Sequence, residues 1–169
     1  NVAKEYGISR EMQDELALLS QRKALAAIDS GAFRAEIVPV SVTSRKKTTI
    51  FERDEFPKAD STTEGLAALR PAFDKSGTVT AGNASGINDG ASFVVLASAE
   101  AASKKGYKPM ARLVAHAVAG VDASIMGDGP IPATQLALKR AGLKIDQIDV
   151  IEANEAFAAQ ALAVAKGLG

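Results

Sequence analysis

The stretch Asp146-Gln-Ile-Asp-Val-Ile-Glu-Ala-Asn-Glu-Ala-Phe-Ala-Ala-Gln160 decides the fold. Its apolar run over 150–153 predicts a short buried strand that leads directly into a helix over 155–166. Asn154 stands at the junction, where an asparagine oxygen can accept the free N–H groups of the first helical turn. In α/β folds, ligands usually bind where the carboxyl end of a strand meets a helix. The stretch therefore predicts an α/β fold and a candidate ligand site at Asn154.

The residues before this stretch extend the same pattern. Nearly continuous apolar runs over 91–98 and 111–121 predict buried strands. Helices are predicted over 99–105 and 130–140, each followed by a glycine within two residues. The resulting order of strands and helices favours a parallel or mixed sheet with helices on its faces.

The N-terminal part predicts a long helix and a hairpin. Apolar residues recur at roughly helical spacing over 11–30, and Ser9 is a suitable N-cap for this helix. Alternating apolar residues predict a strand over 33–42 and a partner strand over 48–51. The basic residues at 45–47 are expected to form the solvated turn between these strands.

The composition excludes several classes of function. Lys+Arg and Asp+Glu number 20 each, so no net charge attracts a nucleic acid or an anionic membrane surface. No apolar run approaches the roughly 20 residues of a membrane-spanning helix. The chain has no cysteine and one histidine, His116, which excludes disulfides, a cysteine nucleophile and multi-histidine metal sites within it. His116 lies in an apolar run and is expected to be a core or interface residue.

A glycine-rich segment, Gly77-Thr-Val-Thr-Ala-Gly-Asn-Ala-Ser-Gly-Ile-Asn-Asp-Gly90, is the second candidate site. Glycine lacks a Cβ, so the backbone here can approach a ligand closely. No Lys-Ser/Thr pair follows, which excludes a Walker A nucleotide loop. A tight connection between two elements, with Ser85 bonded to its own backbone, is an equally good explanation from the residues alone.

Three segments together resemble signatures of the thiolase family. They are 154–160 (Asn-Glu-Ala-Phe-Ala-Ala-Gln), the glycine-rich segment 77–90, and 126–134 (Met-Gly-Asp-Gly-Pro-Ile-Pro-Ala-Thr), in the order and spacing of the family. The resemblance runs along essentially the whole chain and implies a central piece of the α/β thiolase fold. It assigns 1–87 to part of the coenzyme A-binding loop domain. Residues 88–108 would be the last strand and helix of the N-terminal half, and 109–169 the start of the C-terminal half, both halves containing mixed sheets of βαβα type.

The resemblance also implies an activity, namely the condensation of two acetyl-CoA molecules to acetoacetyl-CoA and coenzyme A, or the reverse thiolysis. Met126 within Met-Gly-Asp-Gly-Pro resembles the short-chain biosynthetic type. By matching positions, Asn154 would hold a catalytic water at the oxyanion site. The positions that match coenzyme A-binding or acyl-pocket residues of the family are Ser85, Ala81, Lys58, Phe73, Met126, Ala156 and Phe157.

Each of these positions also has a plain structural explanation. Asn154 could be only a helix cap, Met126 and Phe157 could be core residues, and Lys58 could be a solvated surface lysine. The two family cysteines and the Gly-His-Pro motif are absent, and covalent thioester catalysis needs a thiolate, so the segment alone is expected to be inactive. The alternative function is a non-catalytic coenzyme A-binding or interaction module derived from a thiolase.

The family resemblance sets the remaining expectations. Coenzyme A thioesters would be substrates, and no metal or redox cofactor is implied. The whole chain would form a homo-oligomer, a dimer or tetramer, in the cytoplasm, without nucleic-acid or membrane partners.

Overall fold

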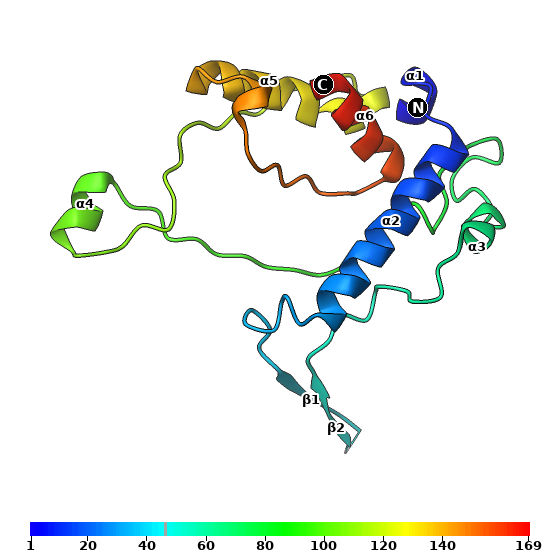
Figure 1. Ribbon diagram of the computed structural model, residues 1–169, viewed down its shortest axis with the longest axis horizontal. Coiled ribbons are helices and arrows are strands. Elements are labelled where there is room, and N and C mark those ends of the chain that lie inside the picture. Colours follow the sequence, from blue (N-terminus) through cyan, green and yellow to red (C-terminus); the bar gives the residue numbers. More distant parts are fainter. Residues whose placement is uncertain (46) are drawn as a thin grey trace.

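The computed structural model of the chain describes residues 1–45 and 47–169. Lys46, in the predicted hairpin turn, lies outside the described residues. Figure 1 shows helix α4 standing apart from the other helices, with a hairpin at one end of the molecule and long extended connections between the elements. The elements of the first 70 residues are α1 (Val2–Glu5), α2 (Arg10–Asp29), β1 (Val40–Ser44), β2 (Lys47–Phe51) and α3 (Thr63–Ala67). The later elements are α4 (Ala99–Lys104), η1 (Ala123–Asp128), α5 (Pro130–Ala141), η2 (Ile145–Gln147) and α6 (Ala158–Leu168).

Helix α2 is the longest element, and its start was predicted correctly. Ser9 is the N-cap, and its side-chain oxygen accepts a hydrogen bond from the backbone N–H of Met12 at 3.2 Å. The predicted apolar stripe was only partly right. Met12 is exposed, whereas the buried residues of α2 are Gln13, Asp14 and Leu18. Two polar side chains therefore face the interior, and they require hydrogen-bond partners there.

The predicted hairpin forms, but with shifted bounds. Strands β1 and β2 pair antiparallel, with Val40 opposite Phe51 and Ser44 opposite Lys47. The first strand begins at Val40 because the chain before it is folded into turns over 30–36, where Ile37 N–H donates to Phe33 O at 3.2 Å. Pro39 has no N–H for a sheet ladder. The strand predicted over 33–42 is thus corrected to 40–44.

Helix α6 is the centre of the C-terminal packing. It contacts α1, α2, α5 and η1, and its residues Ala158, Ala159, Ala163 and Val164 are buried. Gly167 lies directly against Ile131 of α5, where an added Cβ would come within 2.5 Å of the isoleucine side chain. Small side chains on α6 therefore allow several helices to approach it at once. Helix α5 ends as predicted, at Gly142 in the left-handed region.

The short helix η1 begins at Asp122, whose side chain accepts the N–H of Ser124 at 2.7 Å. This hydrogen bond to the charged form holds the pKa of Asp122 below its usual range. A second polar contact joins η1 to α1, because the Tyr6 phenol donates to Asp128 Oδ2 at 3.0 Å. That bond to the carboxylate raises the pKa of Tyr6.

Three segments predicted as buried strands are not strands in the structure. Residues 91–98, 111–121 and 150–153 have no ladder partner among the described residues. Figure 1 shows these segments as extended connections on the open side of the molecule, running to and from α4 and toward α6. Phe93 is 95% exposed, and Val95, Val118 and Val150 are also exposed. The prediction of buried strands is therefore wrong for this structure, because a strand exists only when a neighbour accepts its hydrogen bonds.

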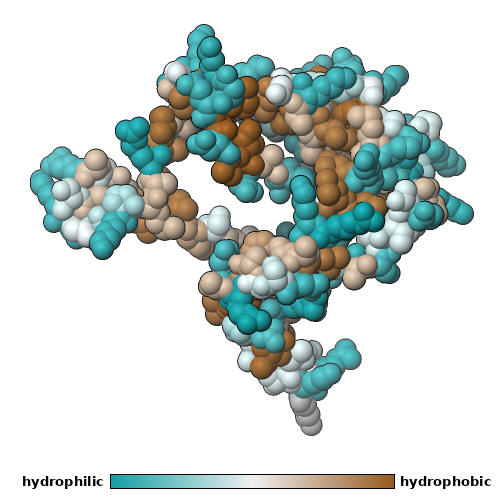
Figure 2. Space-filling model, viewed as in Figure 1, coloured by the Kyte–Doolittle hydropathy of each residue, from teal (hydrophilic) through white to brown (hydrophobic). Residues whose placement is uncertain are grey.

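His116 lies in one of these segments. Its side chain is exposed, so the expectation of a core position is wrong for this structure. Its backbone carbonyl accepts a hydrogen bond from Arg140 Nη1 of α5 at 2.7 Å. Figure 2 shows hydrophobic side chains bordering an open space in the middle of the molecule, next to these segments.

Candidate functional site

The glycine-rich segment folds into a tight turn over 80–83. The Thr80 N–H donates to Asn83 Oδ1 at 2.8 Å, and the Asn83 N–H donates back to Thr80 O at 3.3 Å. Thr80 Oγ1 also accepts the N–H of Gly82 at 3.2 Å. Both Thr80 and Asn83 are buried. The turn is therefore rigidly defined by its own polar groups.

The absence of a side chain at Gly82 lets this turn lie against α3. A Cβ built at Gly82 would approach Leu66 Cδ2 to 2.5 Å and Leu69 Cδ1 to 2.6 Å. An added Cβ would therefore require the Leu66 and Leu69 side chains or the turn to shift, and Leu66 is buried, which makes its rearrangement costly. The prediction that glycine permits close approach holds here, although the close partner is the protein interior.

The same segment joins the stretch around Asn154. The Ser85 N–H donates to the carbonyl of Ala156 at 2.9 Å, and Ala84 forms an isolated antiparallel bridge with Phe157. The Ala158 N–H donates to the carbonyl of Asn83 at 2.9 Å. Two of the three segments that carry the family resemblance thus lie side by side.

This junction corrects the predicted role of Asn154 as a helix cap. Helix α6 begins at Ala158 with Phe157 as its N-cap residue, because the bridge to Ala84 holds Phe157 in an extended conformation. The N–H of Ala158, which would otherwise lack a partner at the helix start, donates to Asn83. Asn154 is exposed in the extended chain before the helix. Its side-chain amide therefore does not cap the helix.

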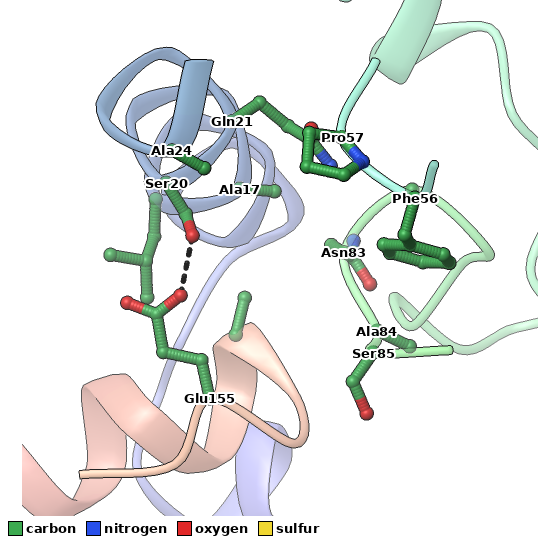
Figure 3. A pocket seen from close by; sticks show the side chains of 13 residues that line it. Ala17, Ser20, Gln21, Ala24, Phe56, Pro57, Asn83, Ala84, Ser85 and Glu155 are labelled. Carbon is green, nitrogen blue, oxygen red and sulfur yellow. Dashed lines mark hydrogen bonds between the residues drawn. The ribbon is translucent and has the colours of Figure 1, made fainter. Parts of the chain in front are cut away.

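A cavity of about 210 Å³ lies beside this junction. Figure 3 shows helix α2 on one side, the segment with Phe56 and Pro57 on another, and Asn83, Ala84 and Ser85 below them. Glu155 closes the remaining side, and its Oε2 accepts a hydrogen bond from Ser20 Oγ of α2 at 2.6 Å. The α2 residues that line the cavity are Leu16, Ala17, Ser20, Gln21 and Ala24.

The lining is mainly apolar, with a few polar groups at fixed positions. Among the described lining residues, Glu155 is the only charged one, so the cavity walls themselves provide no cation for a phosphate. Gln21 Oε1 accepts the backbone N–H of Lys58 at 2.8 Å, which fixes the chain next to Pro57 while the Lys58 side chain stays exposed. An apolar slot with a hydroxyl at Ser85 and the exposed Lys58 cation nearby suits a long, mostly neutral ligand with a charged end.

The structure brings four of the predicted site residues together. Ser85, Ala156 and Phe157 share the junction, and Phe73 packs edge-on against Phe157 with ring centroids 6.3 Å apart and an interplanar angle of 66°. Such an edge-to-face pair is a favoured aromatic arrangement. Asn154 precedes this group by two residues along the chain.

Among the predicted site residues, only Ser85 lines the cavity. Ala81 is exposed, and Met126, in η1, is 77% exposed. Neither residue lines the cavity. Met126 and Phe157 are both exposed, so neither is a core residue, which was the plain structural explanation for these two positions.

Sequence reasoning missed the residues that hold the turn. Asn83 donates to Asp14 Oδ1 of α2 at 2.9 Å and to the carbonyl of Thr78 at 3.1 Å, and Gln13 Nε2 donates to Thr78 Oγ1 at 2.8 Å. The sequence offered no clear signal for Gln13 and Asp14, because they stand in a mostly polar stretch over 10–15. Their partners Thr78 and Asn83 lie 65 and 69 positions away along the chain.

The described part of the chain contains neither a metal-binding cluster nor a membrane-spanning helix. No group of three or more His, Cys, Asp or Glu side chains in residues 1–45 and 47–169 is arranged to hold a metal ion. No helix in those ranges is both long and apolar enough to cross a bilayer.

Family models identify the class to which this fold and site belong. Residues 1–100 match the family model described as "Thiolase, N-terminal domain", and residues 107–169 match "Thiolase, C-terminal domain". The chain belongs to the thiolase family, as the three sequence segments predicted. The two models together cover nearly all of the chain.

Several curated relatives are similar to this chain over its whole length. The acetyl-CoA acetyltransferase of Escherichia coli (strain K12) is 68% identical over 169 residues, which are 100% of this chain and 43% of that protein. The beta-ketothiolase BktB of Cupriavidus necator is 56% identical over 170 residues, again covering 100% of this chain and 43% of the relative. This chain thus spans about two fifths of the length of the curated relatives it matches.

A solved structure confirms the predicted fold. The crystal structure of Bacillus anthracis acetyl-CoA acetyltransferase superposes with a TM-score of 0.93 at 52% identity, covering 99% of this chain and 43% of that one. Human mitochondrial 3-ketoacyl-CoA thiolase superposes with a TM-score of 0.91 at 47% identity. The extended segments therefore follow the backbone course of a thiolase even though they lack strand partners here.

Proposed function

We propose that a thiolase-length chain containing these residues is an acetyl-CoA acetyltransferase. It would condense two acetyl-CoA molecules to acetoacetyl-CoA and coenzyme A, or carry out the reverse thiolysis. The observation that carries the proposal is the junction of Ser85 with Ala156 and Phe157 beside the cavity. This junction places the segment predicted to contact coenzyme A directly next to the segment predicted to act on the thioester.

The coenzyme A arm would pass along the glycine-rich segment. Pantetheine is long and flexible and contains two amides, so it suits the Ser85 hydroxyl and the exposed backbone near Ala81. Phe73 would cover an apolar part of the arm, and Lys58 would lie near the phosphates as a single point charge. The acyl group would contact Met126, Ala156 and Phe157.

Asn154 would act at the reacting carbonyl. Negative charge develops on the thioester or enolate oxygen during the reaction, and a fixed donor stabilises it more in the transition state than in the ground state. Asn154 would hold a water molecule for this purpose. Its exposed amide, which caps no helix, supports this role.

The nucleophile must come from outside these residues. The chain has no cysteine, and a thiolate is the group that accepts the acyl moiety in covalent thioester chemistry. The segment alone would therefore be inactive. The reaction needs only the coenzyme A thioester as substrate, without a metal or redox cofactor. A cytoplasmic location and a homo-oligomer, dimer or tetramer, belong to the same proposal.

We also propose the domain division at 87/88 and 108/109. Residues 1–87 would form part of the coenzyme A-binding loop domain, 88–108 the end of the N-terminal half, and 109–169 the start of the C-terminal half. The interval between the two family models, from residue 100 to 107, supports a boundary close to the second position.

The test begins with an intact mass of the purified protein. A mass well above that of 169 residues identifies the protein to assay for thiolysis of acetoacetyl-CoA. Formation of acetyl-CoA that depends on coenzyme A supports the proposal. If the longer protein binds coenzyme A but transfers no acyl group, the proposal is contradicted. That result favours the alternative function, a non-catalytic coenzyme A-binding module. The absence of cysteine from these residues is the observation that supports this alternative.

A further inference from the structure

We infer that Asn83, held by Asp14, is a positioning residue that sets the spacing between the Ala84–Ser85 strip and the Ala156–Phe157 wall of the site. The inference rests on the proposed function and deepens it. It concerns two residues that are not themselves expected to touch the reacting atoms.

Asn83 is fixed at every polar end of its side chain. Its Nδ2 donates to Asp14 Oδ1 at 2.9 Å and to Thr78 O at 3.1 Å, and its Oδ1 accepts the Thr80 N–H at 2.8 Å. The residue is only 3% exposed. With both amide N–H groups used in a buried setting, the side chain has one favourable orientation, and the backbone of Asn83 is held with it.

Asp14 is fixed from its other side. Arg10 Nε donates to Asp14 Oδ2 at 2.7 Å, and Arg10 Nη2 donates to the carbonyls of Leu66 at 2.6 Å and Leu69 at 2.9 Å. Asp14 is 5% exposed, so its carboxylate depends on these donors for its solvation. The chain of polar contacts Arg10–Asp14–Asn83 therefore connects α2, the end of α3 and the turn.

The backbone of Asn83 transmits this position to both sides of the site. Its carbonyl accepts the N–H of Ala158, the first residue of α6, at 2.9 Å, and the next two residues make the contacts to Phe157 and Ala156. A shift of Asn83 would thus displace Ser85 and the start of α6 together. Both the hydroxyl proposed for the pantetheine arm and the chain that carries Asn154 depend on one buried amide.

The decisive variant is Asn83→Asp in the thiolase-length protein. The new carboxylate has the same shape but faces the Asp14 carboxylate and the Thr78 carbonyl, so attraction becomes repulsion. We expect kcat/KM for thiolysis to fall on the order of a hundredfold, since a misplacement of about 1 Å has that effect on a bound geometry. Gln135→Glu, the same amide-to-carboxylate change at an exposed position of α5 outside the proposed site, should leave kcat/KM within about twofold of the parent.

The exchange variant Asp14→Asn with Asn83→Asp separates positioning from folding. It restores an amide opposite a carboxylate, so we expect it to recover at least tenfold of the lost kcat/KM, the non-additivity expected of residues in direct contact. Such a recovery is expected only if the hydrogen bond between positions 14 and 83 itself sets the geometry of the site. A double variant that is no better than Asn83→Asp, although folded by circular dichroism, would overturn the inference.

Hydrogen exchange provides a readout that does not depend on activity. In Asn83→Asp, the amides of Ser85 and Ala158 should lose protection, while that of Met12, bonded to Ser9, should retain it. Unchanged protection at Ser85 and Ala158 would contradict the positioning role even if the enzyme proved inactive.

If the parent neither binds coenzyme A nor transfers acyl groups, the proposed function fails, whereas the exchange data still decide the positioning claim. Should Asn83→Asp not fold, Asp14→Asn is measured in the same way, with the same two amides deciding.

Discussion

The backbone N–H of Ser85 donates to the carbonyl of Ala156 at 2.9 Å, so the two candidate segments of the site are joined through their main chains. The Ser85 hydroxyl takes no part in this bond. Ser85 can therefore be substituted without breaking the junction, which makes the proposed coenzyme A contact testable separately from the fold.

Ser85→Trp should block coenzyme A binding. An indole ring cannot fit beside the pantetheine arm in a cavity of about 210 Å³, and we expect the Kd for coenzyme A to rise by at least about tenfold. Titration calorimetry of the thiolase-length protein measures it. Ser103→Trp, at an exposed position of α4, adds the same ring away from the cavity and should bind normally. An unchanged Kd for Ser85→Trp would show that the arm does not pass Ser85.

Asn154→Ala should slow the chemical step and leave binding intact. Loss of one oxyanion-site donor typically lowers kcat on the order of a hundredfold. Because the Asn154 side chain is exposed, the free energy of unfolding should change by less than about 0.5 kcal/mol. Steady-state kinetics of acetyl-CoA condensation with a coenzyme A titration measures both quantities. Glu152→Ala, two residues earlier in the same exposed chain, is the control, and equal turnover of the two variants would exclude the oxyanion role.

Local signals in the sequence predicted much of this structure. The Ser9 cap, the ends of α4 and α5 before Gly106 and Gly142, and the hairpin around β1 and β2 depend on residues close together in the chain. Because interactions between neighbouring residues determine these features, composition and spacing are enough to predict them.

The missed features depend on contacts between distant residues. The extended run over 91–98 has a β-forming composition, but no ladder partner lies beside it among the described residues. The start of α6 moved from Asn154 to Ala158 because Ala84, far earlier in the chain, pairs with Phe157. The Asp14–Asn83 bond is of the same kind. Single-sequence reasoning identifies residues suited to a site, but it does not show which distant partner fixes them.

Gly82→Ala should destabilise the protein through a steric clash. Its Cβ would lie 2.5 Å from Leu66 Cδ2 and 2.6 Å from Leu69 Cδ1, so the two leucine side chains, the turn or α3 must shift, at a cost of about 1–3 kcal/mol. Gly90→Ala is the matched control, since nothing lies within 4 Å of a Cβ there and its φ is not positive. Urea unfolding measures both variants. Equal midpoints would mean that the turn does not pack against α3 in solution.

Arg10→Met should cost more stability than any surface change on the same helix. The substitution keeps much of the aliphatic stem but leaves the buried Asp14 carboxylate without its cation and the carbonyls of Leu66 and Leu69 without a shared donor. Removing one partner of a buried ion pair typically lowers the free energy of unfolding by about 3–5 kcal/mol, and the partial exposure of Arg10 favours the lower end.

The controls for Arg10 separate charge from geometry. Arg22→Met, exposed on α2, should change the free energy of unfolding by less than about 0.5 kcal/mol. Arg10→Lys keeps the charge but loses the planar fork that reaches both Asp14 and the carbonyl of Leu66, so an intermediate loss is expected. Urea unfolding of the three variants should therefore rank them Arg22→Met, Arg10→Lys and Arg10→Met in order of falling stability. If Arg10→Lys matched the parent, the point charge alone would suffice to solvate Asp14, and the bonds from Arg10 to the end of α3 would contribute nothing to holding the turn.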